Sequence, residues 1–487
     1  MCGVRSCDAG QEVRSLSLFD AEAGGRDSES GAGMSPRTTL VSLRRLRSCC
    51  HMRPAALARS TAPQRWPVRC WDAGIPLEMN RVPPPPADVL RAVEHLLVTH
   101  APLRRTIDGG GMPGARYVES RALSAAAITR AAGEDWAAAA REECLRPFEH
   151  GAAHAMWRVA VVVPRGGGVR LVVTLHHALT DGRGGAHVAA LLAGALALAP
   201  ADRATGDGQP TDEALHPPVE AVVDVRPTLG RLLSELATAH LPWLRTESRG
   251  WLGPSAAVST EARAAGAALV HATMRCERLL AACRAHGTTV HGALAAAAAS
   301  ACAAAAPGRP ATLCSAVDLR ARGDARVPVA ALRSYVCAAR TTSAAPDDEF
   351  WDRARAAAAD VAAGWRGGAT EVGLLAFLGG SWVDFFRDAF AARAPNGRSC
   401  TCELSNLGVV DVGGAGGGEW PGVGGLEAVH FAQLKPFYGP VIMLSACTCV
   451  QPRGMRGWRG VRGGVMDAAE CRAPTAPRCS ASCSRTP

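Results

Sequence analysis

Residues 169–185 read Val-Arg-Leu-Val-Val-Thr-Leu-His-His-Ala-Leu-Thr-Asp-Gly-Arg-Gly-Gly, and the fold is inferred outward from this stretch. An apolar run typical of a buried strand leads into His176 and His177, and Asp181 follows four residues later. Neighbouring side chains in a strand point to opposite faces of the sheet. We therefore expect one histidine to face a cleft and the other to face the body of the protein.

The residue types in this stretch suit proton transfer. An imidazole with a pKa near ~6.5 can take a proton from a hydroxyl or an amine and return it to a leaving thiolate. Gly182, and the glycines after it, allow close approach of a backbone segment or a ligand. Asp181 lies where the chain turns back, close enough to hold the histidine loop or to pair with a distant arginine. A bare histidine pair is usually structural or part of a metal site, whereas His-His-x-x-x-Asp-Gly between a strand and a helix rarely occurs by chance.

This pattern resembles that of the condensation-domain-like, acyl-CoA-dependent acyltransferases, which share the fold of chloramphenicol acetyltransferase. The alcohol acetyltransferase and polyketide-associated branches are the most similar, and the resemblance extends from Trp71 to Thr448. It implies an α/β (α+β) fold of two halves, each a mixed sheet with flanking helices, that meet at a central tunnel. It also implies that His177 is the general base, that Asp181 and Gly182 shape the loop, and that His176 supports it.

Two segments of the second half carry the resemblance further. Leu313 to Arg320 is strand-like and ends in a motif that the family shares, which implies that Arg320 approaches the histidine loop and pairs with Asp181. An exposed turn charge is the alternative for Arg320. Residues 275–306 resemble the opening helices of the family's second half, and His291 there is a candidate by residue type only. Packing at the start of a helix is the preferred interpretation of His291.

The segment Cys402-Glu-Leu-Ser-Asn-Leu-Gly resembles a family strand that lies against the acyl channel. Ser405 or Asn406 is therefore a candidate donor to an oxyanion, a role worth ~3 kcal/mol in other enzymes. Hydrogen bonding at the end of a sheet is equally compatible with these two residues. The family implies no bound cofactor, and acyl-CoA would serve as a co-substrate.

The resemblance implies direct attack of an alcohol or amine on the acyl thioester, with the alcohol favoured. No activated serine or cysteine is evident, so no covalent acyl-enzyme is expected. Two alternatives remain open: a condensation domain whose donor thioester sits on a carrier protein, and an inactive binding protein with the same fold. The expected partners are thus a small-molecule acyl donor and acceptor, with a carrier protein as the alternative donor.

Changes in composition divide the chain into five parts. They are a disordered leader (1–70), an N-terminal half with the histidine loop (71–225), a bridging segment (226–264), a C-terminal half (265–449) and an aperiodic basic tail (450–487). The family continues beyond the last part of the resemblance with a strand and a helix, whereas the tail shows no periodicity. We therefore expect an incomplete C-terminal half and an unpaired sheet edge at residues 441–449.

Charge and composition exclude several functions. The formal net charge is +9, but the excess of arginine lies in residues 30–71 and 452–487, so nucleic acid is not expected as a partner. Lys435 is the single lysine, which excludes a Walker A motif. The Cys400/Cys402 and Cys447/Cys449 pairs have only one residue between their members, so no metal site is expected.

The sequence also predicts where the protein works. No apolar run reaches the ~18–20 residues that span a bilayer, so no transmembrane segment is expected. Cysteines of the body, such as Cys144 and Cys276, lie in apolar or helical runs and are interpreted as buried thiols of a reducing compartment. These features predict an intracellular, cytoplasmic protein. The Arg- and Ser-rich, acid-free stretch that begins at Met34 leaves organelle targeting as an alternative.

Overall fold

The computed structural model shows two units, Met1–Trp66 and Pro67–Pro487, and every described residue lies in the second. The described residues are 72–79, 85–108, 116–204 apart from 121, 152, 166–168 and 199, 216–240, 251–252, 269–320 apart from 273 and 275, 327–328, 331–343, 349–367, 372, 398–411, 426–433 and 439–450. The predicted leader and nearly all of the predicted basic tail lie outside them.

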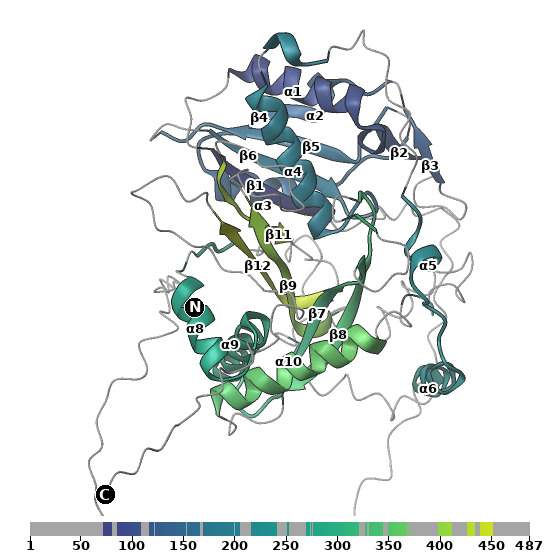
Figure 1. Cartoon of the computed structure of the whole chain (residues 1–487), viewed down its shortest axis with the longest axis vertical. Coiled ribbons are helices and arrows are strands. Elements are labelled where there is room, and N and C mark those ends of the chain that lie inside the picture. Colours follow the sequence, from purple (N-terminus) through teal and green to yellow (C-terminus); the bar gives the residue numbers. More distant parts are fainter. Residues whose placement is uncertain are drawn as a thin grey trace, which may run out of the picture. The chain divides into compact units, whose positions relative to one another are not determined.

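The first sheet is mixed and has the strand order β10-β1-β6-β5-β4, with β11 also paired to β1 (Figure 1). Its strands are β1 (Asp72–Met79), β4 (Thr129–Ala131), β5 (Trp157–Val162), β6 (Val169–His176), β10 (Leu426–Val429) and β11 (Ala432–Gln433). β5 and β6 form an antiparallel hairpin, and β4 runs parallel to β5. β2 (Arg105–Asp108) and β3 (Arg116–Glu119) form a separate antiparallel pair.

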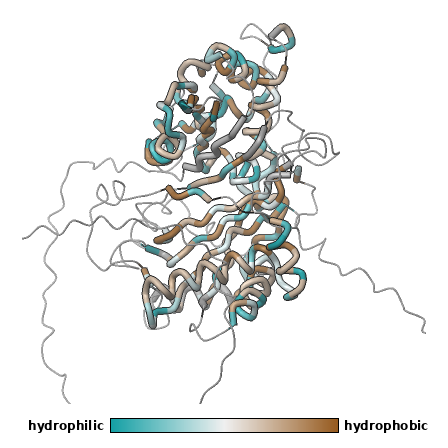
Figure 2. Tube along the Cα trace, turned by 90° about the vertical axis from the view of Figure 1, so that its left-hand side faces the viewer, coloured by the Kyte–Doolittle hydropathy of each residue, from teal (hydrophilic) through white to brown (hydrophobic). Residues whose placement is uncertain are grey.

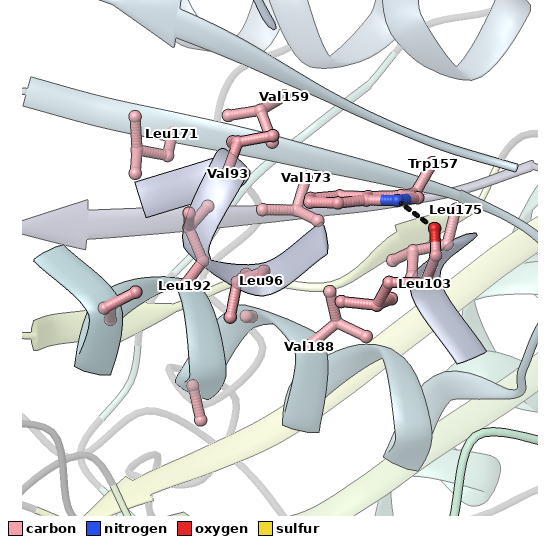
Figure 3. Close-up of a cluster of buried hydrophobic side chains, with 14 of the residues drawn as sticks. Val93, Leu96, Leu103, Trp157, Val159, Leu171, Val173, Leu175, Val188 and Leu192 are labelled. Carbon is pink, nitrogen blue, oxygen red and sulfur yellow. Dashed lines mark hydrogen bonds between the residues drawn. The ribbon is translucent and has the colours of Figure 1, made fainter. Parts of the chain in front are cut away.

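Helices cover both faces of this sheet. Leu171, Val173 and Leu175 of β6 pack with α1 (Pro86–Thr99) and α4 (Gly182–Ala197), as Figure 3 shows. Val172 points to the opposite face and packs with α3 (Trp136–Leu145). The apolar run of β6 is continuous because both faces of the strand are buried.

The second sheet is also mixed, with the order β12-β9-β7-β8. Its strands are β7 (Ala311–Asp318), β8 (Val336–Ser343), β9 (Arg398–Asp411) and β12 (Gly439–Val450). β9 is parallel to β7 and β12, whereas β8 is antiparallel to β7. β12 is the outermost strand of the described part of this sheet, at the position where the sequence predicted an edge.

The remaining helices are short or flank the second sheet. They are η1 (Ala101–Arg104), α2 (Ala125–Ile128), η2 (Pro200–Asp202), α5 (Val219–Val222), α6 (Leu229–His240), α8 (Cys276–Ala285), α9 (Val290–Ala305) and α10 (Phe350–Gly367). Alanine and cysteine side chains of α9 pack on β7 and β9. Figure 2 shows hydrophobic residues concentrated in the strands, while hydrophilic residues recur along the helices.

Mixed sheets with flanking helices confirm the predicted fold class, but the two halves share strands. Residues 426–433, which the sequence analysis assigned to the C-terminal half, form β10 and β11 and pair with β1 of the first sheet. Leu407 and Cys447 of the second sheet also belong to the core of the first half. A boundary at residue 265 therefore describes the sequence, whereas the first sheet and its core include residues from both sides of it. The tunnel stays a prediction.

No single helix in the described part of the chain is long and apolar enough to cross a membrane. The consecutive helices α8 and α9 meet that criterion only together, and the chain bends by 96° between them.

Candidate active site

The histidine loop begins where β6 ends. His176 is the last residue of the strand, a turn carries His177, and α4 begins at Gly182. The side chain of His176 is buried, with 1% of the residue exposed, whereas His177 is partly exposed. The loop thus gives its two adjacent histidines different surroundings.

His176 lies inside the protein on the α3 side of β6. Its Nδ1 accepts a hydrogen bond from the Ala178 N–H at 3.1 Å, and the rings of Phe148 and His150 meet it edge-on with centroids 5.6 and 5.7 Å away. Burial, followed by the nearby His150, lowers the pKa of His176 to about 3. His176 is therefore neutral at physiological pH.

Asp181 accepts four hydrogen bonds and caps α4. Its Oδ1 accepts from the Gly184 N–H at 3.1 Å and from Arg320 at 3.0 Å. Its Oδ2 accepts from Arg320 at 2.8 Å and from the Tyr335 N–H at 2.9 Å. The ion pair expected from the resemblance is present and bidentate. Because a carboxylate offers about four lone-pair sites, these bonds use the acceptor capacity of Asp181.

Arg320 ties the end of β7 to this carboxylate and is itself buried. It also donates to Asp318 at 3.0 Å and to the Ala331 carbonyl at 3.2 Å, and its guanidinium lies 4.9 Å from the Tyr335 ring centroid. Burial opposes the charge, but Asp181 and then Asp318 raise the pKa of Arg320 above its usual value. Arg320 therefore stays charged, and its ion pair with Asp181 joins residues of the two halves.

The glycines of the loop permit contacts within the protein itself. A Cβ on Gly182 would lie 2.5 Å from Leu407 Cδ2 and 3.4 Å from the Phe431 ring. A Cβ on Gly184 would collide with the Thr180 hydroxyl. The close approach predicted from these glycines is thus made by side chains of β9, of the β10–β11 connection and of the loop.

β9 separates the two candidate oxyanion donors. Leu404 packs against α9, while Leu407 reaches the first-half core and contacts Gly182. Alternation along the strand then gives Ser405 the face of Leu407 and Asn406 the face of Leu404. Ser405 is the candidate on the side of the histidine loop.

A bulge interrupts β9 just beyond these residues. Asn406 pairs with Ala446 and Val409 with Thr448, so Leu407 and Gly408 together oppose Cys447. Gly408 has φ +75° and donates its N–H to Asn406 Oδ1 at 3.0 Å. Asn406 thus supports the bulge.

His291 lies apart from the histidine loop by its contacts. His291 stands at the start of α9, and its Nε2 is 2.8 Å from the Oγ of Ser315 on β7. Burial lowers the pKa of His291 to about 4. This agrees with packing at a helix start. Across the described ranges, no group of three or more His, Cys, Asp or Glu side chains is arranged to hold a metal ion.

The contacts of Tyr335, Phe148 and His150 with the loop were not predicted from the sequence. Tyr335 holds Asp181 through its backbone N–H, which leaves no side-chain signal. Phe148 and His150 contact His176 from a segment 26 to 28 residues earlier in the chain.

Comparison with known proteins gives one family match, to the C-terminus of phthiocerol/phthiodiolone dimycocerosyl transferase over residues 261–412. No curated protein sequence matches the chain. The matched range contains Arg320 and Ser405.

Solved structures match over most of the chain. A trichothecene 15-O-acetyltransferase from Fusarium sporotrichioides is 12% identical with a TM-score of 0.54, over 82% of this chain and 88% of that one. The first condensation domain of the CDA synthetase is 16% identical with a TM-score of 0.47, over 82% and 84%. Polyketide synthase associated protein 5 from Mycobacterium tuberculosis is 15% identical with a TM-score of 0.47, over 82% and 90%. At such identities a structural match describes the fold.

Proposed function

We propose that this chain, a member of the condensation-domain-like acyltransferase superfamily by family match and fold, moves an acyl group from acyl-CoA to the hydroxyl of a small-molecule alcohol. The observation that carries the proposal is the Asp181 carboxylate at the start of α4. It is held by Arg320 and by the backbone amides of Gly184 and Tyr335. This arrangement fixes the loop that presents His177.

In the proposed reaction, His177 takes the proton of the acceptor hydroxyl as its oxygen attacks the thioester carbonyl carbon. The resulting tetrahedral oxyanion accepts a hydrogen bond from the Ser405 hydroxyl. Collapse of the intermediate forms the ester and expels the CoA thiolate, which receives the proton from His177. The proton, the acyl group and the thiolate are thus all accounted for without a covalent acyl-enzyme.

Two features of the described residues support these roles. His176 is neutral, enclosed and bonded through Nδ1, which leaves His177 as the histidine of the loop with access to a substrate. Burial raises the pKa of Cys283 to about 11 and that of Cys402 to about 12. Both thiols are therefore poor nucleophiles at neutral pH.

The choice of an alcohol acceptor follows the alcohol acetyltransferase-like motif of the loop. It also agrees with the O-acetyltransferase activity for which the Fusarium protein of this fold is named. A carrier-protein thioester is the alternative donor.

The test is a panel of acyl-CoA donors, from acetyl to long-chain, assayed by thiol release with alcohol and amine acceptors and with an acyl carrier protein as the competing donor. We expect acceptor-dependent thiol release from CoA donors, and its loss in His177→Ala. His286→Gln, at the exposed residue that directly follows α8, is the matched control and should retain activity. Turnover with the carrier-protein donor alone would favour condensation, and no turnover with any donor would contradict the proposal.

A further inference from the structure

His176 has one ring nitrogen for which the described residues supply no partner. Its Nδ1 accepts the Ala178 N–H, so the neutral ring carries its proton on Nε2. Nε2 is buried and has no hydrogen-bond partner among the described residues. A buried donor normally has an acceptor, so this N–H points to one that is not a protein atom of the described segments.

The ring of His150 presents the complementary group. It lies edge-on to His176, with centroids 5.7 Å apart and an interplanar angle of 73°. Its own Nε2 is also buried and without a partner in the described part of the chain. A neutral imidazole has one acceptor nitrogen, and a water molecule with two bonds of ~2.8 Å can join ring nitrogens about 5 Å apart.

The segment that carries His150 is held in place by a buried arginine. Arg158 of β5 donates to the Arg146 carbonyl at 2.8 Å and to Glu143 Oε2 at 2.8 Å. Its guanidinium also lies 3.8 Å from the centroid of the Phe148 ring, which in turn meets His176. These contacts anchor the segment that places His150 beside His176.

We propose that His150 is a positioning residue: one water molecule joins the His176 Nε2–H to His150 Nε2 and thereby fixes the turn that presents His177. The bridge sets the His176 ring, and the bond from Ala178 N–H to its Nδ1 transmits this orientation to the loop. The consequence for turnover rests on the proposed acyl transfer, whereas the bridge itself does not.

Protonation of His150 breaks the bridge because it turns the acceptor nitrogen into a donor. The titratable groups that act on His150 and His176 are His154 on the segment of His150, which is paired with Glu149, and His177 beside His176. Arg158 of β5, which is paired with Glu143 of α3, also acts on His176. Burial, and then His154, lower the pKa of His150. We therefore expect the bridge to be intact at neutral pH and lost only below about pH 6.5.

Two variants separate the bridge from simple packing. His150→Phe keeps a ring of similar size without an acceptor, and His150→Gln keeps an acceptor without a titration in this range. At pH 8 we expect His150→Phe to lower kcat about tenfold at unchanged KM and His150→Gln to stay within about threefold of the parent. The acid limb of the kcat profile should be steeper in the parent than in His150→Gln, because only the parent loses two functional groups to protonation.

A second measurement does not depend on activity. Nitrogen-15 NMR of imidazole-labelled protein should show the His176 proton on Nε2 in the parent, in slow exchange with solvent, and fast exchange in His150→Phe. His154 is a neighbouring imidazole that does not stack on His176, so His154→Gln should leave the signal unchanged. A proton on Nδ1 of His176, or equal exchange in the parent and His150→Phe, overturns the bridge. If the NMR result holds but no donor is turned over, the proposed function fails and the bridge stands.

Discussion

The two adjacent histidines of the loop differ in what their removal should cost. His177→Ala should lower kcat by ~10²–10⁴ with little change in thermal stability, as removal of a general base typically does. His176→Ala should instead lower soluble yield and melting temperature, because it empties a site enclosed by Phe148 and His150. Steady-state kinetics and thermal denaturation of the two variants check both statements. Equal activity of His177→Ala and the parent would remove His177 from the mechanism.

The Asp181–Arg320 pair should be strongly coupled in stability. Asp181→Asn leaves the buried Arg320 charge without its carboxylate, which should destabilise the protein by ~3–5 kcal/mol. The measurement is a double-mutant cycle of Asp181→Asn and Arg320→Met by urea denaturation. A coupling near zero would show that the pair contributes nothing as a pair.

Acid should destabilise the fold through its buried neutral histidines. The pKa of His176 is lowered to about 3 and that of His291 to about 4, so each must stay neutral while the unfolded chain takes up a proton. Each histidine contributes fully to the free energy of unfolding above pH ~6.5, which is the pKa of histidine in the unfolded chain. As the pH falls from there toward the pKa in the folded protein, this contribution is lost by about 1.4 kcal/mol per pH unit for each histidine. Urea unfolding at pH 7.5, 6 and 5 measures this. His291→Gln should reduce the slope, and equal stability at pH 7.5 and 5 would contradict it.

Among the elements, α4 depends on glycine at its first residue because β9 approaches it. Gly182→Ala should destabilise the protein by ~1–3 kcal/mol and disturb the loop, since its Cβ would lie 2.5 Å from Leu407 Cδ2. Gly194 of the same helix is a matched control, because no described atom lies within 4 Å of a Cβ built there. Gly194→Ala should stabilise the helix by up to ~1 kcal/mol. Thermal denaturation compares the two, and equal effects would argue against the contact with β9.

Elements with local periodic signals were predictable from the sequence. Apolar runs indicate the two strands of the β5–β6 hairpin, and helical spacing indicates α1, whose buried Val89, Val93 and Leu97 recur every four residues. Pairing between distant strands has no such signal. Nothing in residues 426–433 indicates β1 as their partner, because strand pairing is set by the packing of the whole fold.

The candidate site divides in the same way. The family-like motifs predicted that Arg320 pairs with Asp181, and the structure confirms this pair, since each residue lies in a recognisable pattern of its own. The role of His177 as the general base stays a prediction. The motifs could not choose between Ser405 and Asn406, which required the pleat of β9 and the position of Leu407. His150 carries no motif and became visible only through its distance from His176.

For the whole molecule, the shared strands predict that the halves do not fold separately. A fragment of residues 67–225 lacks β10 and β11, and it lacks Leu407 and Cys447, which complete the first-half core. Such a fragment should be poorly soluble and should show weak amide protection, whereas the full chain is protected. Hydrogen exchange on both samples checks this. A monomeric fragment with a cooperative unfolding transition would show that the first sheet is self-sufficient.

The pairing of Leu77 with Val429 also matters while the ribosome is still at work. At ~5–20 residues per second, β1 is synthesised roughly 18–70 s before β10. During that interval one edge of β1 has exposed N–H and C=O groups, which can recruit strands from other nascent chains. We expect chaperones to cover that edge during synthesis, and the speed of translation between the two strands sets how long they must act.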